Sequence, residues 1–182
     1  EDTLTALDYL LSRADELNID TNRIVLKGES AGAYTALTVT YCADKFENSG
    51  PTIAAVIDFA GGISETFCGG GTAIDPGEAA VFMVYATADK DTIHHRALSI
   101  VEGATAAGIT YELYAYRPPY IIESSIAQPS FIGGLEQTTT QSYRAKLDPH
   151  KTNDGRKIDD LMYEFLDRVL YDENPTQIEV SP

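Results

Sequence analysis

A serine between two glycines gives the sequence its clearest chemical signal. Residues 28–32 are Gly-Glu-Ser-Ala-Gly, so Ser30 lies at the centre of a G-x-S-x-G pattern. A short apolar run precedes this pattern and apolar residues at helical spacing follow it, which is the context that a nucleophile elbow requires. A serine at such an elbow projects above the sheet and can attack a carbonyl carbon. The alternative is a chance occurrence of the pattern in a glycine- and serine-rich loop.

Each position of the expected elbow has a physical role. We expect Ser30 to have strained backbone dihedrals. We expect Gly28 and Gly32 to lack side chains because the strand and the helix must approach each other closely there. The amino terminus of the helix favours developing negative charge. The backbone N–H of Ala31 would donate one hydrogen bond to the oxyanion.

The elements that must position this serine alternate along the chain. Continuous apolar runs predict strands, and apolar residues three and four apart predict amphipathic helices. The strands are expected at 23–27, 53–59, 79–85 and 110–116, and the helices at 4–17, 33–41, 97–104 and 158–170. This alternation predicts an α/β fold, a three-layer α/β/α sandwich with a mostly parallel sheet.

Two segments fall outside this pattern. Residues 117–149 show no lasting periodicity and are expected to form a long loop or lid. Residues 173–182, which contain two prolines, are expected to form a flexible tail. Residues 1–172, with 117–149 as an insertion, are predicted to be one partial domain.

Composition narrows the classes of partner. Thirteen basic and 28 acidic residues give a formal net charge of −15. Such a negative field repels nucleic-acid phosphates and anionic lipids, so neither is an expected partner. The longest apolar runs are a few residues, whereas crossing a bilayer takes about 20, and no membrane span is expected. The oligomeric state stays open.

The two cysteines and the first residues leave the compartment open. Cys42 and Cys68 could form a disulfide in an exported protein or stay free thiols in a cytosolic one. The chain opens on Glu1 without a methionine or a visible signal peptide, and a leader could have been removed.

The elbow and the residues before it resemble the α/β-hydrolase superfamily, in its carboxylesterase and lipase-type branch. Residues 17–24 are Leu-Asn-Ile-Asp-Thr-Asn-Arg-Ile, and Gly-Glu-Ser-Ala-Gly follows at 28–32. Members of that branch typically have G-I-D-P-x-R-I before the strand and G-E-S-A-G or G-D-S-A-G at the elbow. The resemblance covers most of residues 1–116 and the final helix. It implies hydrolysis of a small-molecule ester by a Ser-Asp-His triad, without a metal or an organic cofactor.

The resemblance also implies the acid of the triad. The family orders its triad as serine, acid and histidine, with the acid after the second strand beyond the elbow. Asp89 occupies that place, in the run Tyr-Ala-Thr-Ala-Asp at 85–89 where the family has a segment like H-G-T-A-D. Asp91 is the neighbouring substitute. Either aspartate could instead cap the helix that is expected to begin near Thr92.

Only three histidines could serve as the base. His94 and His95 lie on the same loop-to-helix segment as the acid, too close to it in sequence to bridge Ser30 and Asp89. His150 follows the fourth strand and precedes the last helix, where the family places its histidine. It is therefore the predicted base, although a stretch of 32 residues (117–148) replaces the family's short loop.

One part of the family's site has no counterpart in the sequence. The family supplies its second oxyanion donor from an H-G-G loop, and no such loop precedes the elbow here. The chain therefore resembles the carboxyl-terminal half of a hydrolase, without the amino-terminal strands. Two alternatives remain. One is a peptidase of the prolyl-oligopeptidase type, whose elbow usually has an aromatic residue where this chain has Ala31. The other is a catalytically silent hydrolase-fold module used for binding.

Overall fold

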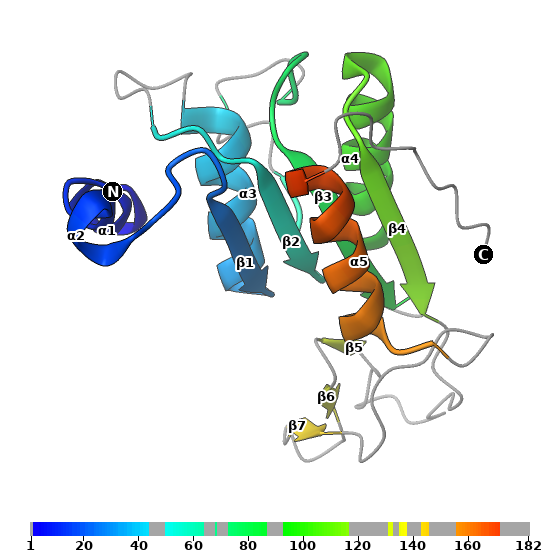
Figure 1. Cartoon of the computed structure of the whole chain (residues 1–182). Coiled ribbons are helices and arrows are strands. Elements are labelled where there is room, and N and C mark those ends of the chain that lie inside the picture. Colours follow the sequence, from blue (N-terminus) through cyan, green and yellow to red (C-terminus); the bar gives the residue numbers. More distant parts are fainter. Residues whose placement is uncertain are drawn as a thin grey trace, which may run out of the picture.

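The centre of the molecule is a four-stranded parallel sheet (Figure 1). The computed structural model describes residues 2–43, 50–63, 68, 73–86, 93–116, 131–132, 135–137, 143–145 and 156–171. The strands are β1 (Val25–Glu29), β2 (Ala55–Phe59), β3 (Ala80–Ala86) and β4 (Tyr111–Tyr116), paired in that order. Because every pair is parallel, the carboxyl ends of all four strands meet at one edge. Ligand-binding loops of open α/β sheets lie at this edge.

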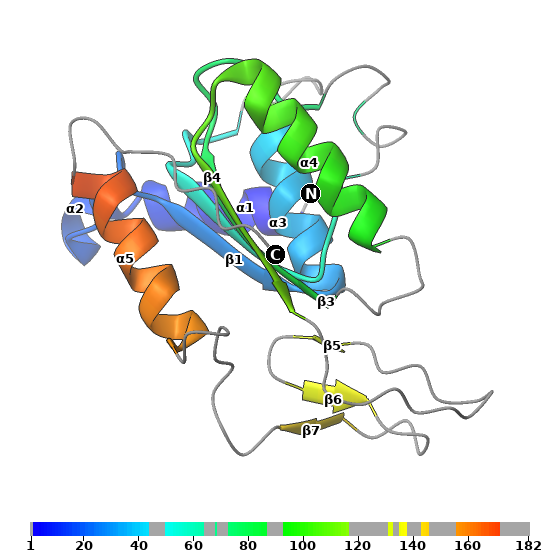
Figure 2. The same cartoon turned by 90° about the vertical axis from the view of Figure 1, so that its right-hand side faces the viewer.

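Helices cover both faces of this sheet. They are α1 (Asp2–Leu11), α2 (Ala14–Leu17), α3 (Ala31–Cys42), α4 (Ile93–Ala107) and α5 (Ile158–Tyr171). Helices α3 and α4 lie on one face and α5 lies on the other (Figure 2). The predicted three-layer α/β/α arrangement with a parallel sheet is therefore confirmed. No strand precedes β1 in the described part of the chain.

Two apolar clusters hold the layers together. On one face Val56, Val81 and Met83 pack with the buried side chains of α3 and α4. On the other face Ile57 and Phe82 pack with α5. Successive residues of one strand point to opposite faces, so a strand covered on both sides is mostly apolar. Packing on both faces of the sheet holds the carboxyl ends of the strands in place, and a functional site can be formed by the loops that follow them.

The predicted helix over 4–17 is two helices. Ser12 and Arg13 form a turn between α1 and α2, and the Ser12 hydroxyl donates a hydrogen bond to the Tyr9 carbonyl oxygen at 2.8 Å. A serine side chain that binds nearby backbone competes with helical hydrogen bonding. Asn18, with φ of 53°, ends α2 at the residue where the sequence predicted the break.

A second, small sheet lies within the segment that was expected to be a loop or lid. Its antiparallel strands are β5 (Phe131–Ile132), β6 (Leu135–Gln137) and β7 (Tyr143–Ala145). They lie beyond the carboxyl edge of the main sheet, and β5 is next to β3 (Figure 1). Strands of two or three residues are too short to leave a recognisable alternation in the sequence. The role of this segment as a lid stays a prediction, and the tail 173–182 lies outside the described residues.

None of the described helices combines the length and the apolar character that a membrane-spanning helix needs.

Candidate active site at the nucleophile elbow

Ser30 joins β1 to α3 at the carboxyl edge of the sheet. Its backbone has φ of 50° and ψ of −120°, a region that residues with side chains rarely adopt. The Ser30 N–H donates to the Phe59 carbonyl oxygen at 2.9 Å, and the Tyr34 N–H donates to the Ser30 carbonyl oxygen at 3.1 Å. The expected strain at Ser30 is therefore confirmed, and neighbouring backbone holds it.

The Ser30 hydroxyl is not used to cap α3. Serine is a favoured residue at a helix N-cap because its oxygen accepts a hydrogen bond from the first turn. Ser30 occupies the N-cap position of α3 but makes no such hydrogen bond, and it is half-buried. Its hydroxyl oxygen thus lies at the amino end of a helix without a capping hydrogen bond to that helix.

The two glycines of the elbow differ in what they permit. A Cβ atom at Gly28 would lie 2.3 Å from the carbonyl carbon and oxygen of Gly32 and 2.4 Å from the Ala33 nitrogen. The need for glycine at position 28 is therefore confirmed. A Cβ atom at Gly32 would meet no described atom within 4 Å outside the backbone of its own helix. The expectation for Gly32 is wrong, because only its backbone lies at the close contact.

Ala31 is the first residue of α3. The first four N–H groups of a helix have no acceptor within the helix, so they point toward solvent or a ligand. Ala31 is exposed. Its position suits the oxyanion donor that the sequence predicts, and that role stays a prediction.

The predicted partners of Ser30 are not described. Asp89, Asp91 and His150 lie outside the described residues. His94 and His95 lie in the first turn of α4, where side chains are not described. The structure therefore gives the backbone geometry of Ser30, and the catalytic roles of Ser30, Asp89 and His150 stay predictions. Within the described ranges, no group of three histidine, cysteine, aspartate or glutamate side chains could hold a metal ion.

A buried carboxylate next to the elbow was missed by the sequence analysis. Asp58 lies in β2 and is fully buried. Its Oδ1 accepts a hydrogen bond from the Gly61 N–H at 2.7 Å, and its Oδ2 accepts one from the Tyr85 hydroxyl at 2.5 Å. Burial raises the pKa of Asp58 from 3.8 to about 6, against the opposite effect of these two hydrogen bonds. An aspartate inside an otherwise apolar strand was the available signal, since a buried carboxylate needs partners.

The turn after β2 is wedged between α3 and α4. Ala60 has φ of 54°. A Cβ atom at Gly61 would lie 2.5 Å from the Ala33 Cβ, and one at Gly62 would lie 2.9 Å from the Arg96 Cβ and Cδ. The Arg96 guanidinium stacks over the Tyr34 ring at 5.1 Å and donates a hydrogen bond to the Tyr34 hydroxyl. The turn after β2 is therefore packed against the amino-terminal residues of both α3 and α4.

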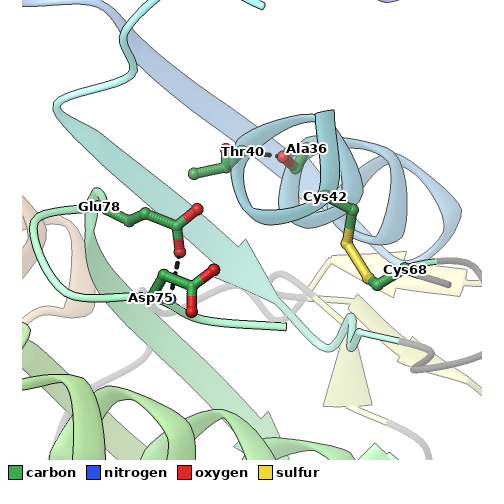
Figure 3. The surroundings of a disulfide bond; sticks show 6 residues. All are labelled: Ala36, Thr40, Cys42, Cys68, Asp75 and Glu78. Carbon is green, nitrogen blue, oxygen red and sulfur yellow. Dashed lines mark hydrogen bonds between the residues drawn. A yellow bond between two sulfur atoms is a disulfide. The ribbon is translucent and has the colours of Figure 1, made fainter. Parts of the chain in front are cut away.

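A disulfide fastens the other end of α3 (Figure 3). Cys42, the last residue of α3, is bonded to Cys68 in the segment after β2, with 5.0 Å between their Cα atoms. Both residues are buried. Of the two alternatives that the sequence left open, pairing is therefore the one that the structure contains. The helix that begins at the elbow is held to the same segment of chain at both of its ends.

Comparisons with known proteins agree with this fold. A family model described as BD-FAE, an α/β-hydrolase-type family, matches residues 1–69. MGS-M1, an α/β-hydrolase enzyme from a Medee basin deep-sea metagenome library, is 25% identical with a TM-score of 0.51, and the match covers 64% of this chain and 47% of that one. The esterase Est2 from Thermogutta terrifontis is 21% identical with a TM-score of 0.54, covering 64% and 51% of the two chains.

A truncated carbohydrate esterase from gut microbiota is 17% identical with a TM-score of 0.53, covering 64% of this chain and 58% of that one. The chain thus spans about half the length of the solved structures that it matches. A comparison with curated proteins gives no match. The parallel sheet with helices on both faces, the strained serine between β1 and α3, and these matches show that the chain has the fold of an α/β hydrolase.

Proposed function

We propose that this chain carries the nucleophile of a serine esterase, which cleaves carboxylic esters of small molecules through an acyl-enzyme. The observation that carries the proposal is the state of Ser30. It combines a nucleophilic residue type, strained dihedrals, a position at the amino end of a helix, and a hydroxyl that does not cap that helix. Strain of this kind persists only where the surrounding structure imposes it, and it is concentrated at functional sites.

The proposed reaction follows from these positions and from the triad that the resemblance implies. The Ser30 oxygen attacks the ester carbonyl carbon while His150 takes the hydroxyl proton, and the Ala31 N–H donates to the resulting oxyanion. His150 then gives the proton to the leaving alcohol, which departs and leaves an acyl group on Ser30. Water then attacks the acyl carbon while His150 takes a proton from it, and His150 returns that proton to the Ser30 oxygen as the bond to the acyl group breaks and the carboxylic acid leaves. Asp89 orients His150 and stabilises its charged form.

Esters are preferred over peptides as substrates for two reasons. The solved structures that resemble the chain include enzymes described as esterases. The residue before the second glycine of the elbow is Ala31, whereas peptidases of the prolyl-oligopeptidase type usually have an aromatic residue there. The Cys42–Cys68 disulfide favours an oxidising compartment, so we further propose that the enzyme is exported.

Substitution of the serine in the full-length protein tests the proposal. Ser30→Ala is expected to lower the hydrolysis rate of p-nitrophenyl acetate by about 10⁶-fold, as loss of a triad nucleophile does elsewhere. A fluorophosphonate, which labels activated serines, should modify the unchanged protein and not this variant. Ser12→Ala is the matched control, because the Ser12 hydroxyl lies on the exposed turn after α1.

The outcomes separate the candidate functions. Retained turnover in Ser30→Ala would refute the esterase proposal. Absence of both labelling and turnover in the folded, unchanged protein would favour the silent binding module instead. Faster cleavage of a peptide bond than of its matched ester would favour the peptidase.

A further inference from the structure

Backbone hydrogen bonds join three strand ends at the carboxyl edge of the sheet. The Ser30 N–H, just after β1, donates to the carbonyl oxygen of Phe59 at the end of β2. The Ala60 N–H, one residue further, donates to the Val84 carbonyl oxygen in β3 at 3.0 Å. The position of the elbow therefore depends on the path of the chain directly after β2.

Asp58 holds that path through two different elements. Its Oδ1 accepts from the Gly61 N–H, which belongs to the turn after β2. Its Oδ2 accepts from the hydroxyl of Tyr85, one residue before the end of β3. Hydrogen bonds to an ionised acceptor are stronger than neutral ones, so one carboxylate ties the turn to the neighbouring strand.

The surroundings of Asp58 give no simpler reason for a carboxylate. Every other residue of β2 is apolar and buried. Within the described part of the chain, the titratable and charged groups around this site are Tyr34 and Tyr41 of α3, Tyr85 of β3, Glu78 before β3 and Arg96 of α4. Of these, the one cation, Arg96, is bonded to the Tyr34 hydroxyl. A buried charge without a cationic partner is costly, and an apolar side chain of similar size would serve packing better.

The turn that Asp58 holds is closely packed against its neighbours. A Cβ atom at Gly61 would lie 2.6 Å from the Asp58 Oδ1 as well as against Ala33 of α3. The carboxylate, the turn and the first turn of the elbow helix are therefore packed against one another. A change in the hydrogen bonding of Asp58 reaches Ser30 through Phe59 and Ala60.

We propose that Asp58 is a positioning residue of this active site, whose carboxylate keeps the elbow and the end of β3 in one relative placement. The residues after β3 include Asp89, the predicted acid of the triad. Asp58 would thus align the serine-bearing segment with the segment that leads to the acid, and it touches no reacting atom itself. The inference rests on the proposed esterase function.

Protonation provides a way to test this role. Burial raises the pKa of Asp58 to about 6, so the group becomes neutral in mildly acidic solution. A protonated carboxyl has an O–H donor in place of one acceptor, and it cannot keep both hydrogen bonds unchanged. The Tyr85 hydroxyl lowers the pKa of Asp58, so its removal should move this titration to higher pH.

The experiment is a set of pH–rate profiles for p-nitrophenyl acetate hydrolysis by the full-length protein. Asp58→Asn should lower kcat by about 10- to 100-fold, the size of effect that a small misplacement produces, with KM nearly unchanged. Tyr85→Phe should move the acid limb of the kcat profile to higher pH. Tyr41→Phe is the matched control: it removes a buried tyrosine hydrogen bond to the Ala79 carbonyl oxygen, before the start of β3, and should leave the limb in place.

Three results would overturn the proposal. The first is a kcat of Asp58→Asn above pH 7 that equals the kcat of the unchanged protein. The second is an acid limb of the kcat profile that stays at the same pH in Tyr85→Phe. A loss near 10⁴-fold in Asp58→Asn would also do so, because that is the loss expected for the acid of a triad. If Asp58→Asn does not fold, Tyr85→Phe and Tyr41→Phe still decide the question.

A second readout separates this proposal from the esterase proposal. Hydrogen exchange of the Ser30 and Gly61 amides does not depend on turnover. Both amides should exchange faster in Tyr85→Phe than in Tyr41→Phe. Retained turnover in Ser30→Ala would refute the esterase proposal without bearing on these exchange rates. Unchanged exchange of both amides in Tyr85→Phe would refute the positioning role of Asp58.

Discussion

Gly28→Ala should damage the elbow in a way that no side-chain movement can relieve. The added methyl group would lie 2.3 Å from the carbonyl carbon and oxygen of Gly32 and 2.4 Å from the Ala33 nitrogen. All three atoms are backbone of the first turn of α3, so β1 and α3 must separate by about 1 Å to reach ordinary contact distances. Overpacking in a closely packed interior costs about 1–3 kcal/mol, and a clash with backbone belongs at the upper end of that range.

A loss of about 3 kcal/mol corresponds to a decrease in Tm of about 6–12 °C for a chain of this length. The separation also moves the Ser30 hydroxyl. A displacement of about 1 Å at a reacting group can lower the rate about 100-fold. Gly28→Ala should therefore lose both stability and ester hydrolysis.

Gly32→Ala is the matched control on the other side of the serine. No described atom outside its own helix lies within 4 Å of the added methyl group. Because alanine favours a helix over glycine, this variant should be more stable than the unchanged protein by about 0.4–1 kcal/mol. Its rate of ester hydrolysis should stay near that of the unchanged protein.

Urea unfolding and p-nitrophenyl acetate hydrolysis, measured on the three proteins side by side, check both expectations. If Gly32→Ala loses as much stability as Gly28→Ala, or if Gly28→Ala is neutral, the assignment of the close contact to Gly28 is wrong.

Three further predictions concern stability. Replacing Cys42 and Cys68 by serine should lower the free energy of unfolding by about 3.5 kcal/mol, as expected for a sequence separation of 26; a urea titration giving less than about 1 kcal/mol would contradict this chain-entropy account. The pKa of Asp58 rises from 3.8 to about 6 on folding, so the folded protein favours the protonated carboxyl. The stabilising effect of Asp58 is therefore complete below pH 3.8 and is lost as the pH rises through about 6. The advantage of the unchanged protein over Asp58→Asn in unfolding free energy should therefore fall by about 3 kcal/mol across that range, and a constant difference would contradict it. Arg168→Met should cost about 3 kcal/mol, because it leaves the buried Glu112 carboxylate without its cation, whereas the double variant with Glu112→Leu should stay within about 1 kcal/mol of the unchanged protein. Equal losses in the single and double variants of this urea-measured cycle would show that the ion pair is not the cause.

The sheet could be predicted because its central strands β2 and β3 are buried on both faces. A doubly buried strand is a nearly continuous apolar run, and such a run can be recognised in the sequence without knowledge of the neighbouring strands. The strands expected at 53–59, 79–85 and 110–116 are present as Ala55–Phe59, Ala80–Ala86 and Tyr111–Tyr116. The first strand extends two residues further than the expected 23–27, because its ladder with β2 continues to the pair Glu29 and Phe59. Gly28 and Glu29 also belong to the G-x-S-x-G motif, which was expected to form the turn, so the strand was predicted to end before them.

Contacts between distant residues could not be predicted in the same way. Asp58 and Tyr85 are 27 residues apart, and no local pattern pairs them. The separation of the two cysteine Cα atoms is likewise set by the packing of α3 against the segment after β2, which the sequence alone leaves open. The position of Ser30 could be predicted from the sequence because strand, turn and helix follow one another within a dozen residues. Its predicted partners Asp89 and His150 lie outside the described residues and stay predictions.

The disulfide at the end of α3 also has a consequence for how the protein regains its structure after denaturation. The bond closes a ring of chain from Cys42 to Cys68, and β2 lies inside this ring. In the unfolded chain the ring keeps β2 within short reach of the end of α3. The entropy lost when β2 returns to its place beside β1 is then smaller than in an open chain. Renaturation of the oxidised protein should therefore begin at the unit formed by β1, α3 and β2, and this unit contains the strained turn at Ser30.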